Sequence, residues 1–593
     1  MAERKKQSML NGAFVLVAAT MLVKVIGALY KIPLTALIGE VGRGYFNAAY
    51  EIYTPVYAIS MAGLPVAVSK MVSEKMALKR YNDVKMIYKV ASKIFLITGI
   101  VGTAFLLLIA FPYAKFIIKS PQTFTSIIAI APSVFFCCMM STYRGYYEGL
   151  SNMTPTAISE VIEAMGKLAA GLAFSYAVSA YGMGQYRNGL PVFGKVVTSE
   201  AEALSAIYPY TAAAAILGVT LGTVLGLIFL VLRHKLKGDK ITKEELLGSP
   251  KSINKRETMK MLISFAIPMV LSALVLNITN LIDTATIQNR LAFAVARDLP
   301  TIKEMYAASL TASKTLDTDI AKYLYGAYGA ALDFKNLIPT IIMSLGVSAL
   351  PALSAAWAVK DRKQSKITIE SVIRITMLIA MPAGIGMAVL AKPILTLAYG
   401  GSEAENLIPV ATPILQMCGY ATFLFALSSP LTSMLQAVGR ADLPLKGLVV
   451  GAVIKFVCNY VLVGNARINI NGAPIGSIAC YCFVTIFCLV SLIKVSKVKL
   501  NYISIFLKPT VAGVLSGAAA WVTYSLMGRV LPQGDITSRL NGTTMSALVS
   551  VVAAVIIYVV ALLLIKGISE DDLEMIPKGK KIAKVLAKFG LLG

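Results

Sequence analysis

The 593-residue chain is poor in charge and in histidine, and both shortages exclude classes of protein. Charged residues make up 15% of the sequence, whereas soluble domains carry about 25%, so a soluble globular protein is not expected. The single histidine, His234, excludes a catalytic site or proton relay built on histidine. No DxD-type acidic motif stands in the loops, and we interpret the stretch SEDDLEM as a solvated charge run. We therefore expect neither an enzyme nor a cofactor.

Cysteine is also scarce, and its placement argues against disulfides and zinc. All of the cysteines fall inside apolar segments, and none has metal-ligand spacing in a loop. Small apolar packing residues are the more ordinary role for such cysteines, so we expect no metal site. They are Cys137, Cys138, Cys418, Cys458, Cys480, Cys482 and Cys488.

What the chain has in abundance is long apolar runs. It is 57% hydrophobic with a mean hydropathy of +0.72, and about 20 apolar residues suffice to cross a bilayer. We predict an all-α membrane protein of about 14 transmembrane helices. The candidate spans are 11–38, 44–69, 91–112, 124–147, 155–180, 207–232, 261–288, 323–357 (part of which need not cross), 370–391, 409–436, 444–464, 475–493, 505–527 and 545–566.

The basic residues predict the orientation. With alternating spans and a cytoplasmic amino terminus, about 37 Lys and Arg fall on the inner side and about 14 on the outer side. The heaviest inner loops are 70–93 and 233–260, so both termini are expected in the cytoplasm. The net charge of +26 then reflects this asymmetry and the anionic inner leaflet, not nucleic-acid binding. The amino-terminal run is expected to be a retained helix rather than a signal peptide.

Two pairs of segments indicate internal duplication. Residues 45–69 resemble 328–354, and 149–168 resemble 439–456, both at an offset of about 285 residues. Helices six spans apart run in the same direction, so the halves are expected to be parallel repeats with a substrate site between two bundles. The predicted plan is 1–235, a six-helix bundle; 236–257, a cytoplasmic linker; 258–495, a second six-helix bundle; 496–566, two further transmembrane helices; and 567–593, a basic amphipathic tail on the membrane surface.

Two lysines inside the first apolar run are the first candidates for a binding site. Lys24 and Lys31 lie nearly two helical turns apart, on one face and about 10 Å from each other. A lipid-facing charge at mid-span costs about 2.5 kcal/mol or more, so a water-filled cavity is favoured at Lys24. Lys31 could equally reach the outer interface by extending its side chain.

Further ionisable groups stand inside other spans. Glu51 lies in the second span, and Asp333 with Lys335 occupies the matching region of the eighth. Glu163 and Lys167 are four residues apart and can pair, which leaves open a functional or a merely self-neutralising role. The remaining candidates for ion coupling or ion pairing are Glu160, Asp283, Lys455 and Asn459.

The helix count, the duplicated halves, the segment VKVIGALYK (23–31) and the motif LPALS (350–354) resemble the MurJ-type lipid II flippases. They also resemble the stage V sporulation protein B-like polysaccharide biosynthesis proteins of the multidrug, oligosaccharidyl-lipid and polysaccharide (MOP) exporter superfamily. The resemblance implies a central cationic cavity, with Lys24 at a basic position of the first helix and Lys31 and Lys335 beside two others. The second-helix basic residue is absent, and Glu51 and Tyr57 are nearby instead.

The resemblance also bears on ion coupling. Family members can hold sodium between helices seven, eleven and twelve, where Asp283 and Asn459 fit. Lys455 stands where a neutral or acidic ligand is expected, and an ammonium paired with Asp283 would replace the ion.

The function that follows is a flippase for an undecaprenyl-pyrophosphate-linked glycan, first of all lipid II, working by alternating access in the bacterial plasma membrane. Lysine suits a phosphate group as a point charge. Two alternatives remain: a flippase for another lipid-linked polysaccharide or spore-coat or cortex precursor, and a MATE-type multidrug exporter, whose cavity should be acidic or aromatic. The expected partners are the lipid-linked oligosaccharide and membrane lipids, and the chain is expected to be a monomer that binds no nucleic acid.

Overall fold

The structure is a computed structural model that describes residues 9–58, 64–342, 353, 356–357, 360–400, 402–440, 442–531 and 542–569. Over these residues it is helical, apart from turns, loops and one isolated bridge between Val192 and Lys195. The chain divides into two compact units. The first comprises Met1–Asn289 and Lys314–Gly326, and the second comprises Arg290–Ser313 and Ala327–Gly593. The predicted all-α fold is confirmed.

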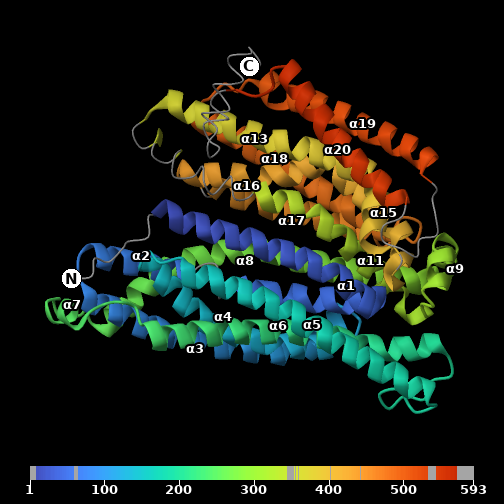
Figure 1. Cartoon of the computed structure of the whole chain (residues 1–593), viewed down its shortest axis with the longest axis horizontal. Helices are drawn as coiled ribbons and strands as arrows, with labels where there is room; N and C mark the ends of the chain where they lie inside the picture. Colours follow the sequence, from blue (N-terminus) through green and yellow to red (C-terminus); the bar gives the residue numbers. More distant parts are fainter. Residues whose placement is uncertain are drawn as a thin grey trace. The chain divides into compact units, whose positions relative to one another are not determined.

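The first unit is a bundle of long helices, in which α3 to α6 run side by side (Figure 1). Its elements are α1 (Met9–Ala58), α2 (Leu64–Ala77), α3 (Tyr81–Pro112), η2 (Tyr113–Ile117), α4 (Thr123–Gly149), α5 (Thr154–Arg187), α6 (Glu200–Lys237), α7 (Lys243–Leu247) and α8 (Lys255–Arg297) as far as Asn289.

Within α1, two helical stretches meet at a kink at Gly39, between the first two predicted spans. Gly39 has φ 64° and ψ 178°, a conformation that only glycine adopts without strain. A Cβ at this position would also lie 2.8 Å from Cε1 of Tyr208 in α6. The kink therefore depends on glycine for both its backbone angles and its packing.

Small residues bring α5 and α6 into close contact. A Cβ on Gly218 would overlap the backbone of Gly171, and one on Gly222 would lie 2.5 Å from the carbonyl oxygen of Glu163. Membrane helices associate through such small residues because lipid supplies no hydrophobic drive between them. This contact fixes the height and rotation of the α5 turn that carries Glu163 and Lys167.

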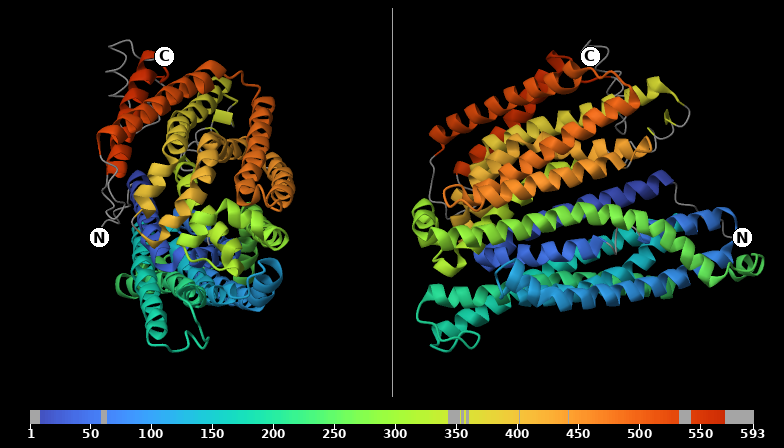
Figure 2. Two further views of the ribbon diagram at one scale, coloured as in Figure 1. Left: turned by 90° about the vertical axis from the view of Figure 1, so that its right-hand side faces the viewer. Right: turned by 180° about the vertical axis from the view of Figure 1, so that it is seen from behind.

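The second unit contains the shorter helices and the two helices at the carboxyl end. Figure 2 shows α19 and α20 packed against each other, and α19 also packs against α13. Its elements are α9 (Leu299–Met305), α10 (Ala307–Ala312), α11 (Ile320–Lys335) from Ala327 onward, α13 (Arg362–Val389), α14 (Ala391–Tyr399), η4 (Glu403–Leu407), α15 (Ile408–Tyr420), α16 (Thr422–Ala437), α17 (Asp442–Leu462), η5 (Asn469–Asn471), α18 (Gly472–Ser496), η6 (Ile503–Leu507), α19 (Lys508–Val530) and α20 (Gly542–Leu564).

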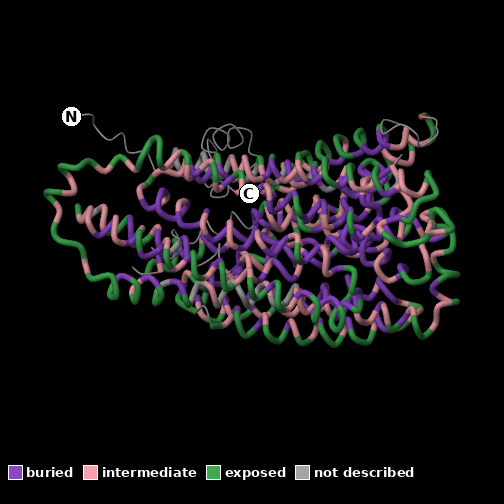
Figure 3. Tube along the Cα trace, turned by 90° about the horizontal axis from the view of Figure 1, so that it is seen from below, coloured by how far each residue is buried: buried purple, intermediate pink, exposed green. Residues whose placement is uncertain are grey.

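The helices are long and apolar enough for a membrane protein with many spans. Nine helices of the described chain meet the length and hydropathy needed to cross a bilayer, or ten when α15 and α16, bent by 50° at their junction, count as one. In Figure 3 buried and exposed positions alternate along the helices. Many of the exposed positions carry large apolar side chains, such as Leu108 and Val530, which suits a surface in contact with lipid.

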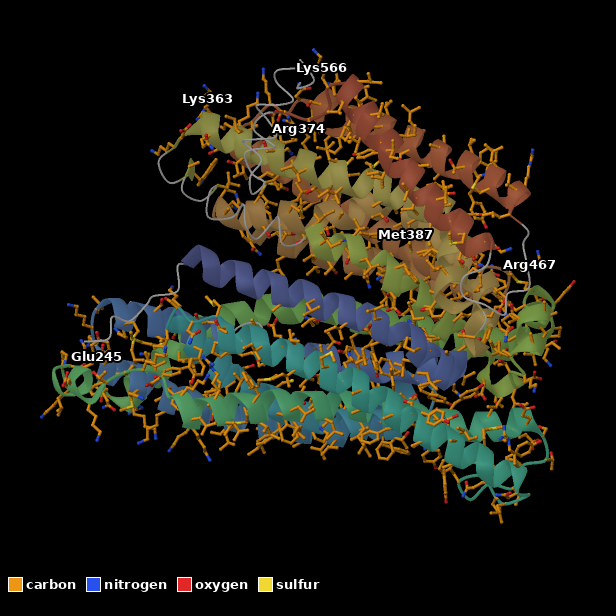
Figure 4. The ribbon with its side chains drawn as sticks, viewed as in Figure 1. Glu245, Lys363, Arg374, Met387, Arg467 and Lys566 are labelled. Carbon is orange, nitrogen blue, oxygen red and sulfur yellow. The ribbon has the colours of Figure 1, made fainter. Side chains whose placement is uncertain are left out.

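The two most basic predicted inner loops contact each other. The Asn82 side chain donates to the carbonyl oxygens of Leu246, Ser249 and Pro250, each at 3.1 Å. In Figure 4 the labelled Glu245 lies at the end of the first unit where these loops meet. Lys363 and Arg467 lie at opposite ends of the second unit. The two loops therefore lie on one side of the membrane, as alternating spans require.

In the packing of the chain, α8 groups with the first unit as far as Asn289. The predicted plan, with a linker at 236–257 and a second six-helix bundle from residue 258, stays a prediction. The predicted tail beyond residue 569 lies outside the described residues.

Candidate functional site

A cavity of about 360 Å³, lined by apolar, tyrosine and charged side chains, lies in the first unit between α1, α4, α5 and α6. Its lining combines tyrosines with charged side chains, an unusual set for the interior of a membrane protein. The tyrosines are Tyr30, Tyr50, Tyr53 and Tyr57, and the charged residues are Arg144, Glu160, Glu163 and Lys167.

The second half of α1 supplies a column of three tyrosines. Tyr50, Tyr53 and Tyr57 follow a spacing of three and four residues, which aligns side chains on one helix face. Their successive ring centroids are 5.6 Å and 5.3 Å apart. The Tyr53 hydroxyl is 3.6 Å from Sγ of Cys137 in α4. The column is thereby packed against α4 and forms one wall of the cavity.

Arg144 and Glu163 form an ion pair across the cavity wall. Nη2 of Arg144 in α4 is 2.9 Å from Oε2 of Glu163 in α5. The Arg144 side chain is 4% exposed and that of Glu163 is 22% exposed. Nε of Arg144 also donates to the Ser159 hydroxyl at 2.9 Å. A guanidinium this deeply buried needs an anionic partner, and Glu163 provides it.

Lys167 has no carboxylate partner among the described residues. Its Nζ is 3.5 Å from the Tyr50 hydroxyl and lies 5.0 Å and 5.5 Å from the ring centroids of Tyr50 and Tyr30. The predicted local pair with Glu163 does not form, because Glu163 binds Arg144 from a neighbouring helix. An ammonium in a cavity, held only by a hydroxyl and two rings, is available to an anionic ligand.

The predicted lysines of the first helix lie in α1, but their side chains are outside the described part of the structure. Lys24 stands in the turn that also contains Val23 and Gly27, both of which line the cavity, and Lys31 follows Tyr30. Glu51 lies beside Tyr50 in sequence but does not line this cavity. Their role in substrate binding stays a prediction.

The other candidates are divided between the two units. Asp283 belongs to the first unit and is buried, whereas Lys455 and Asn459 are buried in α17 of the second. The pairing of Asp283 with Lys455 therefore stays a prediction. Asn459 packs closely against Gly476 of α18: a Cβ on Gly476 would overlap the side-chain amide oxygen of Asn459.

Lys335 ends α11 and is 8% exposed. Its Nζ lies 4.4 Å from the ring centroid of Phe425 and 5.9 Å from that of Tyr481. The neighbouring Asp333 is half-buried. Lys335 thus has an aromatic setting like that of Lys167, and its part in binding substrate stays a prediction.

Sequence reasoning overlooked Arg144 and most of the tyrosine column. Arg144 stands near the inner end of a predicted span, where an arginine is easily taken for an interfacial residue. The helical spacing of Tyr50, Tyr53 and Tyr57 was the available signal for the column. Over the described residues, no group of three or more His, Cys, Asp or Glu side chains is placed to hold a metal ion.

Comparison with solved structures defines the class of fold. A multidrug-resistance MATE transporter of the MOP superfamily, in its inward-facing conformation, matches 82% of this chain and 99% of its own, with a TM-score of 0.60 and 14% identity. The inward closed conformation of lipid II flippase MurJ matches 93% of this chain and 98% of its own, with a TM-score of 0.57 and 12% identity. The chain is a multi-pass membrane protein with the fold of MOP-superfamily transporters.

Family models and individual protein sequences also match this chain. The polysaccharide biosynthesis protein family matches residues 9–190 and the MatE family matches residues 322–461. Stage V sporulation protein B of Bacillus subtilis is 24% identical over 577 residues, which are 96% of this chain and 98% of that protein. Lipid II flippase MurJ of the same organism is 23% identical over 562 residues, 92% of this chain and 93% of its own. The chain is thus similar over more than nine-tenths of its length to stage V sporulation protein B and to a lipid II flippase.

Proposed function

We propose that the protein flips an undecaprenyl-pyrophosphate-linked glycan, first of all lipid II, across the bacterial plasma membrane, with both termini in the cytoplasm. The observation that carries the proposal is Lys167, an ammonium that lines the cavity without a carboxylate partner among the described residues. A diphosphate is the part of such a substrate that a cationic site would bind. Similarity to MurJ and to stage V sporulation protein B over more than nine-tenths of the chain supports this substrate class.

The aromatic wall fits the rest of the headgroup. Tyrosine offers an apolar ring face and a polar hydroxyl, and sugars present both C–H and O–H groups. The diphosphate and the sugar next to it would occupy the cavity while the polyprenyl chain stays in the bilayer. Alternate opening of the cavity to the two sides would complete the transfer.

Two other functions fit particular observations. Similarity to stage V sporulation protein B favours a different lipid-linked glycan, such as a spore-coat or cortex precursor. Four tyrosines and two glutamates in the lining are also features of a site for cationic drugs. Arg144 and Lys167 weigh against that reading because they repel cations.

Genetic replacement tests the proposal. A host depleted of its own lipid II flippase should grow when it expresses this protein, and Lys167→Gln should abolish the rescue at equal protein level. Lys115→Gln is the matched control, because Lys115 also lies over aromatic rings, those of Phe111 and Phe116, but is exposed and outside the cavity. Absence of rescue by the normally inserted wild-type protein would refute lipid II as substrate. Rescue of a spore or capsule defect, or drug resistance, would then assign the alternative.

A further inference from the structure

The Arg144–Glu163 pair places a carboxylate inside a cavity that is proposed to receive an anion. A fixed carboxylate there would repel a diphosphate, so a purely static pair works against binding. Arg144 still has donors to offer, because a guanidinium carries five N–H groups, and Glu163 and Ser159 account for two of its nitrogens. Guanidinium groups bind phosphate in the same forked manner as carboxylate. A phosphate group could therefore make the contact with Arg144 that Glu163 makes.

The neighbouring lysine completes a site of suitable size. Glu163 and Lys167 lie on successive turns of α5, and both line the cavity. Their backbone positions are about 6 Å apart along the helix axis. That separation is comparable with the length of a diphosphate group. One phosphate at the Glu163 position and the other at Lys167 would each meet a cation.

We propose that Glu163 is an internal counter-ion that a diphosphate ligand displaces. Lys167 binds one phosphate, and Arg144 exchanges the Glu163 carboxylate for an oxygen of the other. The assignment of the diphosphate to a polyprenyl lipid rests on the proposed function, while the exchange itself applies to any diphosphate. The partly exposed Glu163 side chain can turn into the cavity without moving a packed helix.

The exchange gives Glu163 a role in release. When the substrate leaves, the carboxylate returns to Arg144, so the buried guanidinium is never left without an anion. Breaking the internal pair lowers the affinity for substrate, which lets a transporter unload. Removal of the Glu163 charge should therefore tighten binding and slow turnover.

Binding of inorganic pyrophosphate to the purified full-length protein in detergent, in magnesium-free buffer of low ionic strength, tests this proposal by calorimetry. Glu163→Gln should bind about tenfold more tightly than wild type, since one charge-assisted competitor has been removed. Lys167→Gln should bind at least about tenfold more weakly, and Lys115→Gln should match wild type. Unchanged or weaker binding by a folded Glu163→Gln protein would overturn the proposal.

A second variant covers the case in which Glu163→Gln does not fold. Glu163→Asp keeps the charge but shortens the side chain by one methylene, so the pair weakens and pyrophosphate should bind a few-fold more tightly. Wild-type affinity in Glu163→Asp would contradict the exchange. The experiments distinguish failure of the Glu163 exchange from failure of lipid II as the substrate. Growth rescue without tighter pyrophosphate binding in the Glu163 variants rejects only the exchange. Tighter binding without growth rescue rejects only lipid II.

Discussion

Gly326 of α11 lies against Glu40 of α1 so closely that a Cβ on the glycine would overlap the Glu40 carbonyl oxygen. A second contact of the same kind lies nearby, where a Cβ on Gly44 would be 2.5 Å from the carbonyl oxygen of Lys322. Nζ of Lys322 is 2.8 Å from Oδ1 of Asp319 and 5.0 Å from the ring centroid of Tyr45. The first turns of α11 thus pack closely against α1 just after the kink in α1.

Gly326→Ala should therefore separate these two helices and destabilise the protein. The added methyl group meets backbone, which cannot turn aside as a flexible side chain would, and overpacking of this kind costs about 1–3 kcal/mol. The measurement is the midpoint of thermal unfolding in detergent. Gly184→Ala in α5 is the matched control, since a Cβ there meets nothing within 4 Å, and it should leave the midpoint unchanged or raise it slightly. Equal midpoints for the two variants would show that α11 and α1 are not held by this contact.

The Arg144–Glu163 pair should show coupling in a double-mutant cycle. Arg144→Met leaves Glu163 without its partner in the cavity wall, and breaking a buried pair costs about 3–5 kcal/mol; partial exposure of Glu163 places the expected loss at or below the low end. Replacing both residues by methionine removes both charges and should restore part of the stability. Thermal unfolding of wild type, Arg144→Met, Glu163→Met and the double variant gives the coupling energy. Additive losses would mean that the two side chains do not interact.

Much of the fold could be predicted from the sequence because lipid demands long apolar helices. The predicted span 124–147 corresponds to α4, Thr123–Gly149, and 545–566 to α20, Gly542–Leu564. Errors arise where hydropathy carries no information. The predicted span 91–112 starts late, because α3 begins at Tyr81 and continues through a basic region that an apolar criterion excludes. The bend between α15 and α16 lies within a single predicted span, 409–436, and was not predicted.

The candidate site was less predictable, since its partners come from different helices. The rule that residues four apart can pair suggested Glu163 with Lys167, but it takes no account of neighbouring helices. Arg144 reaches Glu163 from α4, and no local pattern encodes that contact. Lys167 was identified because a charge inside an apolar span is costly wherever it points. The tyrosines that contact Lys167 could not be predicted in this way, because the contact depends on how α1 packs on α5.

Asp239 should stabilise the loop that follows α6 in the first unit at pH values above the acid range. It accepts hydrogen bonds from Lys85, from the Tyr146 hydroxyl and from the backbone amide of Ile241. Burial raises the pKa of Asp239, but these bonds outweigh it and hold the pKa below the ordinary value of 3.8. A depressed pKa in the folded state contributes stability at pH 7 that is lost as the pH falls below about 3.8.

Asp239→Asn should therefore lower stability by about 1–2 kcal/mol at pH 7. Its difference from wild type should shrink as the pH falls below 3.8 toward the lowered pKa of the folded protein, where the wild-type carboxylate becomes protonated as well. Thermal unfolding and limited proteolysis of the loop, measured at several pH values, test this expectation. Glu257→Gln, an exposed substitution in α8, is the control. A difference that stays constant into the acid range would assign the effect to shape rather than to charge.

Lys24→Ala and Lys335→Ala should each abolish translocation of the lipid-linked precursor while expression and membrane insertion stay normal. For Lys335 the structure also offers a stabilising role, because its ammonium lies 4.4 Å from the Phe425 ring centroid, a contact worth about 0.5–2 kcal/mol. Lys335→Arg separates the two roles. Arginine keeps the charge and the ring contact, so stability should be retained, whereas a site that needs the compact ammonium as a point charge should lose transport. Translocation is measured as accessibility of labelled precursor on the outer face of vesicles, beside an unfolding midpoint for each variant. Full transport by both alanine variants would remove Lys24 and Lys335 from the binding site and leave the cavity at Lys167 as its remaining candidate.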